Sequence, residues 1–367
     1  MASIPKTMRA FVLTGHGGMD KLVYHHDWPV PVPKHGEILL KVKACGLNNT
    51  DVNTRTAWYS SSVTEATSGA DLQQADDKDA AWGGAAIEFP RIQGADIVGV
   101  VAEVGDDADA AMIGKRALVD PWLRDWSDPY NRERCKYLGS ECDGGFAEFV
   151  CLDRRQVHPI ESELSHAELA TFATSWVTAE NMLNRGQVYA EDVALVSGAS
   201  GGVGSALIRL ANRRGATTVA LASSAKHRQV RKLGADAVLS RAPADLPGEL
   251  RKAIGRDTVT AALDVVGGEY WSTMIDALAR GGRYVCSGAI AGPMVELDLR
   301  KLYLRDLTFC GATVTAPHTF RDLVGYIAGK EIRPVLAAEY PLESLREAQQ
   351  AFIDKRHTGN IVVAINS

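Results

Sequence analysis

A glycine-rich turn between two regular runs is the part of the sequence whose residue spacing points most directly to chemistry. The apolar, strand-like run Val193 to Val196 leads into this turn, and a helix-like run, 205–214, follows it. Glycines at such a turn permit a sharp bend and a close approach of backbone to a ligand. The unpaired N–H groups at the start of the next helix attract a pyrophosphate. The glycines are Gly198, Gly201, Gly202 and Gly204.

A second strand-like run at 218–222 completes the strand–helix–strand unit that dinucleotide sites require. NAD sites usually place an acid about 20 residues past the glycines, where it binds the ribose 2′-hydroxyl and repels a 2′-phosphate. Here the segment 221–228 holds hydroxyls and cations but no acid. Ser223, Lys226 and Arg228 are therefore predicted to bind the 2′-phosphate of NADPH. The alternative is that the two cations only solvate an exposed helix start, where they oppose the helix dipole.

Length, charge and cysteine usage exclude several classes of function. A chain of 367 residues exceeds one typical domain, and a net charge of -5 offers no basic surface for nucleic acid or an anionic membrane. No apolar run approaches the length of a membrane span, and the first residues lack the pattern of a signal peptide. The six cysteines form no Cys-x-x-Cys pair, which argues against a disulfide framework and a zinc ribbon. We expect a cytoplasmic protein that acts on small molecules.

Two patterns of regular structure divide the chain. Up to about residue 155, short β-rich runs are separated by Gly and Pro clusters, which predicts an antiparallel, barrel-like domain. From about residue 165, strand-like runs alternate with helical ones, which predicts a doubly wound parallel sheet. The strand-like runs are 193–197, 218–222, 236–239, 259–265, 282–287 and 307–311. The tail after 311 has no parallel partner left, so its final strand at 360–365 is predicted to return to the first domain.

The connection between Ala57 and Glu88 is unusually long for a compact domain. It is rich in Ser, Ala, Asp and Gln, and it carries Trp58, Tyr59 and Trp82 near its ends. Such a segment is either a functional lid or a disordered excursion. Aromatic side chains near the ends favour the lid, so we expect residues 60–88 to cover the substrate.

Four motifs together resemble one family of enzymes. They are Ala44-Cys-Gly-Leu-Asn-Asn-Thr-Asp51, Gly94-Ala-Asp96, Asp143-Gly-Gly-Phe-Ala-Glu148 and Ala199-Ser-Gly-Gly-Val-Gly204. With them the chain resembles the medium-chain dehydrogenase/reductases, specifically their zinc-free quinone oxidoreductase branch, over nearly its whole length apart from the segment 60–88. The resemblance implies an α/β fold with two domains and an active site between them. A GroES-like β-barrel catalytic domain would comprise 1–160 and 313–367, and a Rossmann NADP-binding domain 161–312.

The resemblance also bears on zinc. Zinc alcohol dehydrogenases have a Cys, a His and a further Cys or similar ligand at the places that match Asn48, Ala95 and Thr174. None of these three residues binds zinc well, so we expect no metal. Without a Lewis acid, other groups must polarise the acceptor during hydride transfer.

The resemblance places three candidate catalytic residues near one another. Asn48 offers an amide N–H at the place of zinc, and Tyr59 offers a phenol that either donates to the acceptor or forms an aromatic wall for a planar substrate. Thr50 matches the relay hydroxyl of the zinc enzymes. Asp51 and Asp96 are expected to organise the surrounding hydrogen bonds rather than to act as acid–base catalysts.

Further cofactor contacts are expected in loops that follow parallel strands, where ligands bind in open α/β sheets. The predicted set is Thr178, Ser200, Gly201, Gly202, Val203, Ser223, Lys226, Arg228, Val266, Ser287 and Gly288. The sequence therefore predicts a zinc-independent, NADPH-dependent oxidoreductase acting on quinones or α,β-unsaturated carbonyl compounds. The alternatives are an enoyl-thioester reductase, an alcohol dehydrogenase with atypical zinc ligands, and a non-catalytic NADPH-binding sensor. Because 305–311 resembles the edge strand through which this family pairs, a homodimer is expected.

Overall fold

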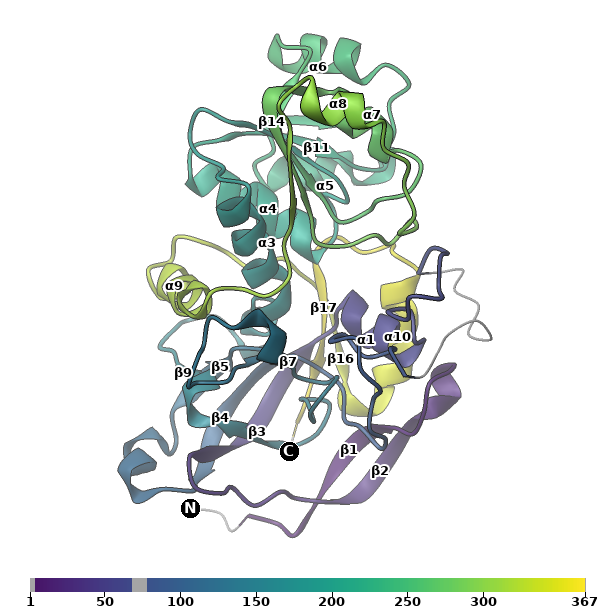
Figure 1. Ribbon diagram of the computed structural model, residues 1–367. Helices are drawn as coiled ribbons and strands as arrows, with labels where there is room; N and C mark the ends of the chain where they lie inside the picture. The colour runs from purple at the N-terminus through teal and green to yellow at the C-terminus, as the bar shows by residue number, and fades with distance from the viewer. Residues whose placement is uncertain (1–3, 68–77, 367) are drawn as a thin grey trace. The chain divides into compact units, whose positions relative to one another are not determined.

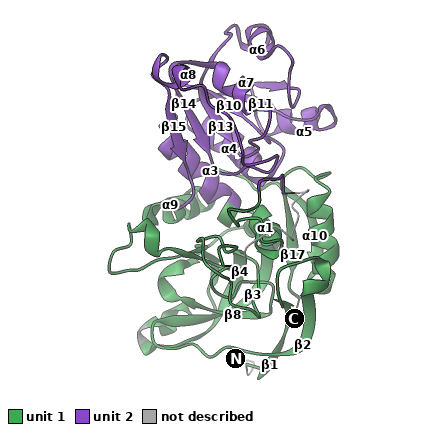
Figure 2. Ribbon diagram, turned by 45° about the vertical axis from the view of Figure 1, so that its right-hand side comes forward, with its two compact units in different colours: residues 1–63, 71–174, 316–367 green, residues 64–70, 175–315 purple. Residues whose placement is uncertain are grey.

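The computed structural model describes residues 4–67 and 78–366, and the chain divides into two units (Figure 2). Unit 1 comprises Met1–Val63, Asp71–Thr174 and Ala316–Ser367, and unit 2 comprises Thr64–Ala70 and Ser175–Thr315. The predicted domain boundaries after residues 160 and 312 stay a prediction. Within the described ranges, no helix combines the length and the apolar character that crossing a bilayer requires.

Unit 1 is built on a mainly antiparallel sheet in the order β16-β17-β3-β4-β5-β9, with β8 also paired to β3. Its strands are β3 (Glu37–Gly46), β4 (Asp96–Val104), β5 (Arg116–Val119), β8 (Phe149–Asp153), β9 (Val157–Pro159), β16 (Leu336–Pro341) and β17 (Asn360–Ala364). Two further antiparallel pairs are β1 (Thr7–Leu13) with β2 (Leu22–Pro29), and β6 (Trp122–Leu123) with β7 (Lys136–Tyr137). Gly and Pro clusters separate these strands, as the sequence predicts.

The C-terminal tail completes the sheet of unit 1. Val363 of β17 pairs with Cys45 of β3, so the predicted return of the last strand to the first part of the chain is confirmed. This pairing buries β17 completely and places it beside the segment that carries Asn48. The α-helices of unit 1 are α1 (Asn49–Arg55), α2 (His166–Leu169), α9 (Pro317–Ala328) and α10 (Leu345–Ile353), and α3 (Ala173–Arg185) runs on into unit 2.

Unit 2 is a parallel sheet of six strands in the order β12-β11-β10-β13-β14-β15, with helices packed around it (Figure 1). The strands are β10 (Val193–Val196), β11 (Thr217–Leu221), β12 (Ala237–Leu239), β13 (Val259–Asp264), β14 (Leu278–Cys286) and β15 (Thr308–Gly311). The helices are α4 (Gly202–Arg213), α5 (His227–Lys232), α6 (Leu246–Ile254), α7 (Trp271–Asp276) and α8 (Leu299–Tyr303). The Rossmann doubly wound fold predicted from the sequence is confirmed.

The core of unit 2 explains why its strands read as continuous apolar runs. All four residues of β10 are buried, because helices cover both faces of a parallel sheet. On one face, Leu195 and Val219 pack with Leu250 of α6 and Trp271 of α7. The strand order reverses between β10 and β13, which is where open α/β sheets bind their ligands.

Candidate active site

Asn48 lies where β3 ends and α1 begins. β3 stops at Gly46 and α1 starts at Asn49, so Asn48 is the residue that caps the helix. The carboxylate of Asp51 accepts the backbone N–H of Asn48 at 2.8 Å, the arrangement expected of an acid in the first helical turn. Asn48 and Asp51 are only 6% and 3% exposed. The motif at 44–51 therefore folds into a buried helix start.

The carboxylate of Asp96 joins Asn48 to Thr174. Asp96 begins β4 and pairs with Gly46 of β3. Its Oδ1 accepts the backbone N–H of Thr174 at 2.7 Å and also the hydroxyl of Thr174. The side-chain amide of Asn48 also acts on this carboxylate and lowers its pKa, as a hydrogen-bond donor does. Two of the three positions that match zinc ligands are thus linked by one buried acid.

Tyr137, which the sequence analysis did not select, extends this cluster. Its hydroxyl lies 2.7 Å from Thr174 Oγ1, although the two residues are 37 positions apart. Tyr137 lies on β7 and is 4% exposed. Its ring packs against Trp122 with 4.8 Å between ring centroids. No sequence motif marks this contact, because it depends on how the segment 120–142 folds back.

Burial sets the protonation of the groups around Asp96. Loss of solvation raises the pKa of Asp51 to about 7 and that of Asp96 to about 6. At Asp96, hydrogen bonds to the ionised form oppose the effect of burial. Burial also raises the pKa of Tyr59 and of Tyr137 above the ordinary value of a phenol. Both phenols therefore keep their protons at neutral pH and can donate them to hydrogen bonds.

Tyr59 is held by the helix that begins beside Asn48. Its hydroxyl forms hydrogen bonds with the side chains of Thr50 and Asn53, both on α1. The ring of Trp58 lies edge-on to it, with 5.9 Å between centroids. The structure therefore brings the three predicted catalytic residues, Asn48, Thr50 and Tyr59, together around α1.

The donor atoms around Asn48 do not suit zinc. Catalytic zinc takes three His, Cys or carboxylate ligands and leaves a fourth position open. The three matching positions here, Asn48, Ala95 and Thr174, offer an amide, a methyl group and a hydroxyl. In the described ranges 4–67 and 78–366, no group of three or more His, Cys, Asp or Glu residues is arranged to hold a metal ion. The residues present do not fit the zinc of the alcohol dehydrogenases.

The predicted lid at 60–88 includes residues 68–77, which lie outside the described residues. In the arm before this gap, Thr67 donates its backbone N–H to Ile290 at 3.1 Å, and both residues belong to unit 2. In the arm after it, the backbone N–H of Gly83 binds Glu141 at 2.9 Å, and the ring of Trp82 lies 4.7 Å from that of Trp122. Both described arms are anchored, and the covering of substrate stays a prediction.

The glycine turn between β10 and α4 depends on the missing side chains of two of its glycines. Gly198 adopts a positive φ of 55°, which L side chains rarely adopt. A Cβ at Gly204 would lie 2.3 Å from the carbonyl oxygen of Gly198, so only glycine permits this approach of α4 to the turn. Helix α4 begins at Gly202, three residues before the predicted start, and is twelve residues long. The predicted contacts at the helix start are Ser200, Gly201, Gly202 and Val203.

A cluster of cations lies where β11 and β12 end. Ser223 precedes a short helical turn that contains Lys226, and Arg228 is exposed on α5. Burial and the nearby guanidinium of Arg241 both lower the pKa of Lys226. Sequence reasoning missed Arg241, which follows β12. The sequence could have identified Arg241, because it follows a predicted parallel strand and neighbouring parallel strands end at the same edge of a sheet.

Asp264, at the end of β13, organises the loops on the other side of the switch point. Its buried carboxylate accepts the hydroxyl of Ser197, the hydroxyl of Tyr284 at 2.8 Å and the backbone N–H of Val266 at 2.8 Å. Sequence reasoning selected Val266 but missed the aspartate that holds it. The carbonyl of Val266 in turn accepts the N–H of Ala291 at 2.8 Å.

The loop after β14 lies beside the Val266 loop. The Ser287 hydroxyl donates to the carbonyl of Ala312 at 2.5 Å, and a Cβ on Gly288 would lie 3.1 Å from the carbonyl oxygen of Val265. The structure thus gathers Val266, Ser287 and Gly288. Thr178 lies on a different element, α3, where it is half-buried.

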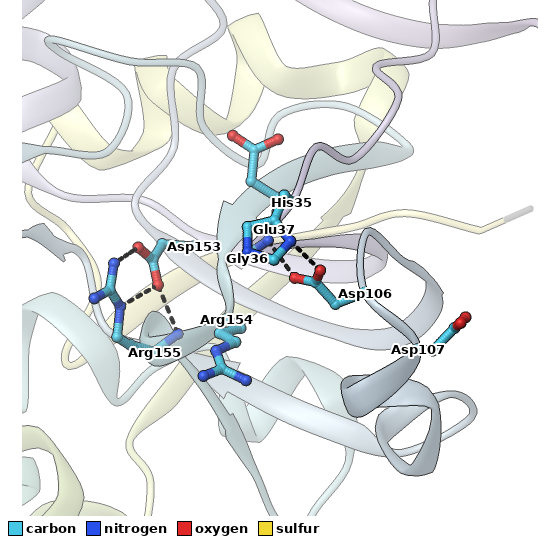
Figure 3. A pocket seen from close by; sticks show the side chains of 8 residues that line it. All are labelled: His35, Gly36, Glu37, Asp106, Asp107, Asp153, Arg154 and Arg155. Carbon is cyan, nitrogen blue, oxygen red and sulfur yellow. Dashed lines mark hydrogen bonds and ion pairs between the residues drawn. The ribbon is translucent and has the colours of Figure 1, made fainter.

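A surface depression of unit 1, about 580 Å³, is built from other residues (Figure 3). Asp106 in its wall pairs with His35 and accepts the N–H of Gly36 at 2.5 Å. Asp153 pairs with Arg155 in the same wall. None of the predicted catalytic residues lines this depression, so it is separate from the cluster around Asn48.

The motifs and the fold agree with the comparisons to known proteins. Residues 34–162 match the family model "Alcohol dehydrogenase GroES-like domain", and residues 202–329 match "Zinc-binding dehydrogenase". The quinone oxidoreductase of Mus musculus is 26% identical over 376 residues and is covered completely, as is this chain. The chain belongs to the medium-chain dehydrogenase/reductase superfamily, a superfamily of nicotinamide-dinucleotide-dependent oxidoreductases.

Two solved structures are similar over nearly their full lengths. One, from Sinorhizobium meliloti 1021 and provisionally described as an alcohol dehydrogenase, is 40% identical with a TM-score of 0.88, over 100% of this chain and 99% of that one. The other, described as an NAD-dependent alcohol dehydrogenase, is 27% identical with a TM-score of 0.86, over 98% of this chain and 100% of that one.

Replacing Gly204 by alanine tests the close approach of α4 to the glycine turn. Alanine normally favours a helix interior, but here its Cβ would meet the Gly198 carbonyl oxygen at 2.3 Å. We expect Gly204→Ala to lower the free energy of unfolding by about 1–3 kcal/mol. Gly201→Ala, whose Cβ would meet its nearest atom at 3.5 Å, should stay close to wild type in urea denaturation. Equal stability of both variants would contradict this packing.

The raised pKa of Asp51 should make the free energy of unfolding depend on pH. A carboxyl whose pKa rises on folding binds its proton more tightly in the folded state. Its contribution is therefore fully present below the unfolded pKa of about 4 and is lost as the pH rises through the folded pKa of about 7. Urea denaturation from pH 4 to pH 8 should show wild type losing stability relative to Asp51→Asn across this window. A difference that is constant with pH would rule out the raised pKa.

Proposed function

We propose that this protein is a zinc-independent oxidoreductase that uses NADPH to reduce a quinone or an α,β-unsaturated carbonyl compound. The observation that carries the proposal is the cluster of Asn48, Asp96 and Thr174, in which Asn48 and Thr174 stand at two of the three positions that match zinc ligands in related alcohol dehydrogenases. The name of the mouse relative, a quinone oxidoreductase, supports the same substrate class.

NADPH would supply the hydride. The residues of unit 1 would bind the oxygen of the acceptor, which gains negative charge as the hydride arrives. The amide N–H of Asn48 and the phenol of Tyr59 are neutral donors suited to this charge, since burial keeps the pKa of Tyr59 high. Thr50 would hold the Tyr59 hydroxyl in place through their hydrogen bond.

The cofactor would be held by residues of unit 2. The twelve-residue helix α4 begins at a glycine turn with no side-chain cap, so its first N–H groups are available to a pyrophosphate. Ser223, Lys226, Arg228 and Arg241 would bind the 2′-phosphate. Arg241 lies close enough to lower the pKa of Lys226, and the segment 221–228 holds no acid, so this edge favours a ligand of negative charge.

An alcohol dehydrogenase is the second candidate, because one structural relative is described as NAD-dependent and as an alcohol dehydrogenase. The two candidates differ in cofactor, acceptor and direction. Purified protein should oxidise NADPH in the presence of 1,4-benzoquinone or an enal, and should not reduce NADP⁺ or NAD⁺ with a panel of primary and secondary alcohols. Alcohol oxidation without quinone reduction would favour the second candidate, and NADPH binding without any turnover would favour a sensor.

Replacing the cationic residues at the ends of β11 and β12 by alanine tests the cofactor assignment. We expect Lys226→Ala and Arg241→Ala each to weaken NADPH binding, measured by fluorescence titration, by roughly tenfold, the size of one charge-assisted hydrogen bond. NADH lacks the 2′-phosphate, so its affinity should change little. Lys252→Ala, at an exposed ion pair on α6, provides the control. Equal losses for both cofactors, or a wild-type preference for NADH, would remove these residues from the phosphate site.

We further propose that the protein is a homodimer that pairs through β15. This strand lies at the end of the sheet of unit 2, and an edge strand offers unpaired backbone groups to a second copy. Large apolar side chains are exposed on and around α8, which directly precedes β15. They are Met294 (70%), Val295 (44%), Leu299 (64%), Tyr303 (63%) and Leu304 (55%). Contiguous exposure of this kind is typical of an interface.

A charge at this face should separate the copies. Leu304→Glu is expected to shift the protein from dimer to monomer in size-exclusion chromatography with light scattering, because an unpaired charge would be buried at the interface. Val32→Glu also replaces an exposed apolar side chain, 78% exposed in unit 1, and should leave the mass unchanged. A Leu304→Glu protein that remains a dimer would place the interface elsewhere.

A further inference from the structure

The hydrogen bonds around Thr174 have a defined direction. An ionised carboxylate only accepts, so the single hydroxyl proton of Thr174 goes to Asp96 Oδ1. Thr174 Oγ1 must then accept at its contact with Tyr137, 2.7 Å away, and the phenol of Tyr137 is the donor. The donors therefore run in one order, from Tyr137 to Thr174 to Asp96. The backbone N–H of Thr174 adds a second donor to the same oxygen at 2.7 Å.

The same carboxylate determines which end of the Asn48 amide faces it. Only the NH₂ group of an asparagine can donate, and the Asn48 amide lowers the pKa of Asp96 as a donor does, so its NH₂ group rather than its oxygen faces the acid. One N–H then faces Asp96, and the same NH₂ group carries a second N–H. The orientation of Asn48 as a donor depends on Asp96 being held in place and ionised.

The described part of the long insert shields this chain of hydrogen bonds. The carboxylate of Glu141 accepts the backbone N–H of Gly83 at 2.9 Å and that of Tyr137 at 2.9 Å, so it ties the second arm of the insert to β7. The ring of Trp82, from this arm, packs on Trp122 and lies 6.0 Å from the ring of Tyr137. Exclusion of water strengthens hydrogen bonds in such a chain.

We propose that Tyr137 is a positioning residue: through Thr174 and Asp96 it holds the amide of Asn48 ready to donate to the oxygen of the acceptor. The inference rests on the proposed reductase function for its kinetic consequence, and it adds a residue outside the motifs of the sequence. It also gives the second arm of the insert, residues 78–88, a role in excluding water from these hydrogen bonds.

Variants that each remove one of these hydrogen bonds test the proposal. With NADPH and 1,4-benzoquinone, Tyr137→Phe and Thr174→Val should each lower kcat roughly tenfold and leave the KM for NADPH unchanged. Because both act through one path, the double variant should lose no more than the worse single variant. Thr174→Ser keeps the hydroxyl and should restore most of the rate. Tyr24→Phe, which removes a surface phenol bonded to Glu343, should match wild type.

The pH profile separates positioning from a general loss of structure. Asp96 is faced by Asp51 from α1, Cys45 from β3 and Tyr137 from β7, with Tyr59 beyond. Removing the donated Thr174 hydroxyl should raise the pKa of Asp96, so the acid limb of kcat/KM should move to higher pH in Thr174→Val. Additive losses in the double variant, an unchanged kcat in Tyr137→Phe, or an unmoved acid limb would overturn the proposal.

A measurement that needs no substrate can test the positioning role of Tyr137 separately from the proposed function. In protein labelled with ¹⁵N-asparagine, Tyr137→Phe should shift the side-chain NH₂ resonances of Asn48, and Tyr24→Phe should not. If wild type reduces no acceptor, the proposed function fails while these resonances still decide whether Tyr137 acts on Asn48. Resonances that do not move in Tyr137→Phe would refute the positioning role whatever the activity.

Discussion

The candidate active site depends on one buried carboxylate, that of Asp96. An acid taken out of water must be satisfied by donors, and here the donors are the backbone and hydroxyl of Thr174 and the amide of Asn48. This requirement fixes side chains from β4, from the start of α1 and from the start of α3 in one arrangement. The same demand sets which atoms of Asn48 and Thr174 point toward the acid and which remain for other partners.

Unit 2 also has a buried carboxylate that accepts several hydrogen bonds, at the edge of its sheet. The buried carboxylate of Asp264 gathers the hydroxyls of Ser197 and Tyr284 and the N–H of Val266, and so fixes the loop after β13. The glycine turn after β10 is set differently, by the small size of Gly204. Each unit thus places its candidate functional loops by a local constraint that is contained within that unit.

The sequence predicted the parts of the molecule that follow from local pattern. The six strands of the parallel sheet and the glycine turn agree with expectation because periodicity and loop residues are local signals. The return of the last strand to the first part of the chain was predicted because no parallel partner was left for it, and β17 does pair with β3. Tyr137 was missed because its partner Thr174 comes from a distant segment. Arg241 was missed although it follows β12, which ends at the same sheet edge as the strand that precedes Lys226. Asn48, Thr50 and Tyr59 were selected by resemblance, and their proximity around α1 could not have been derived from spacing alone.

The central claim is that neutral hydrogen-bond donors perform here the role that zinc performs in related alcohol dehydrogenases. The most direct test measures metal content and activity on the same sample, before and after dialysis against a strong zinc chelator. The account predicts NADPH-dependent quinone reduction at an unchanged rate by protein that contains no stoichiometric zinc. Activity that is lost on chelation and regained when zinc is returned would contradict it.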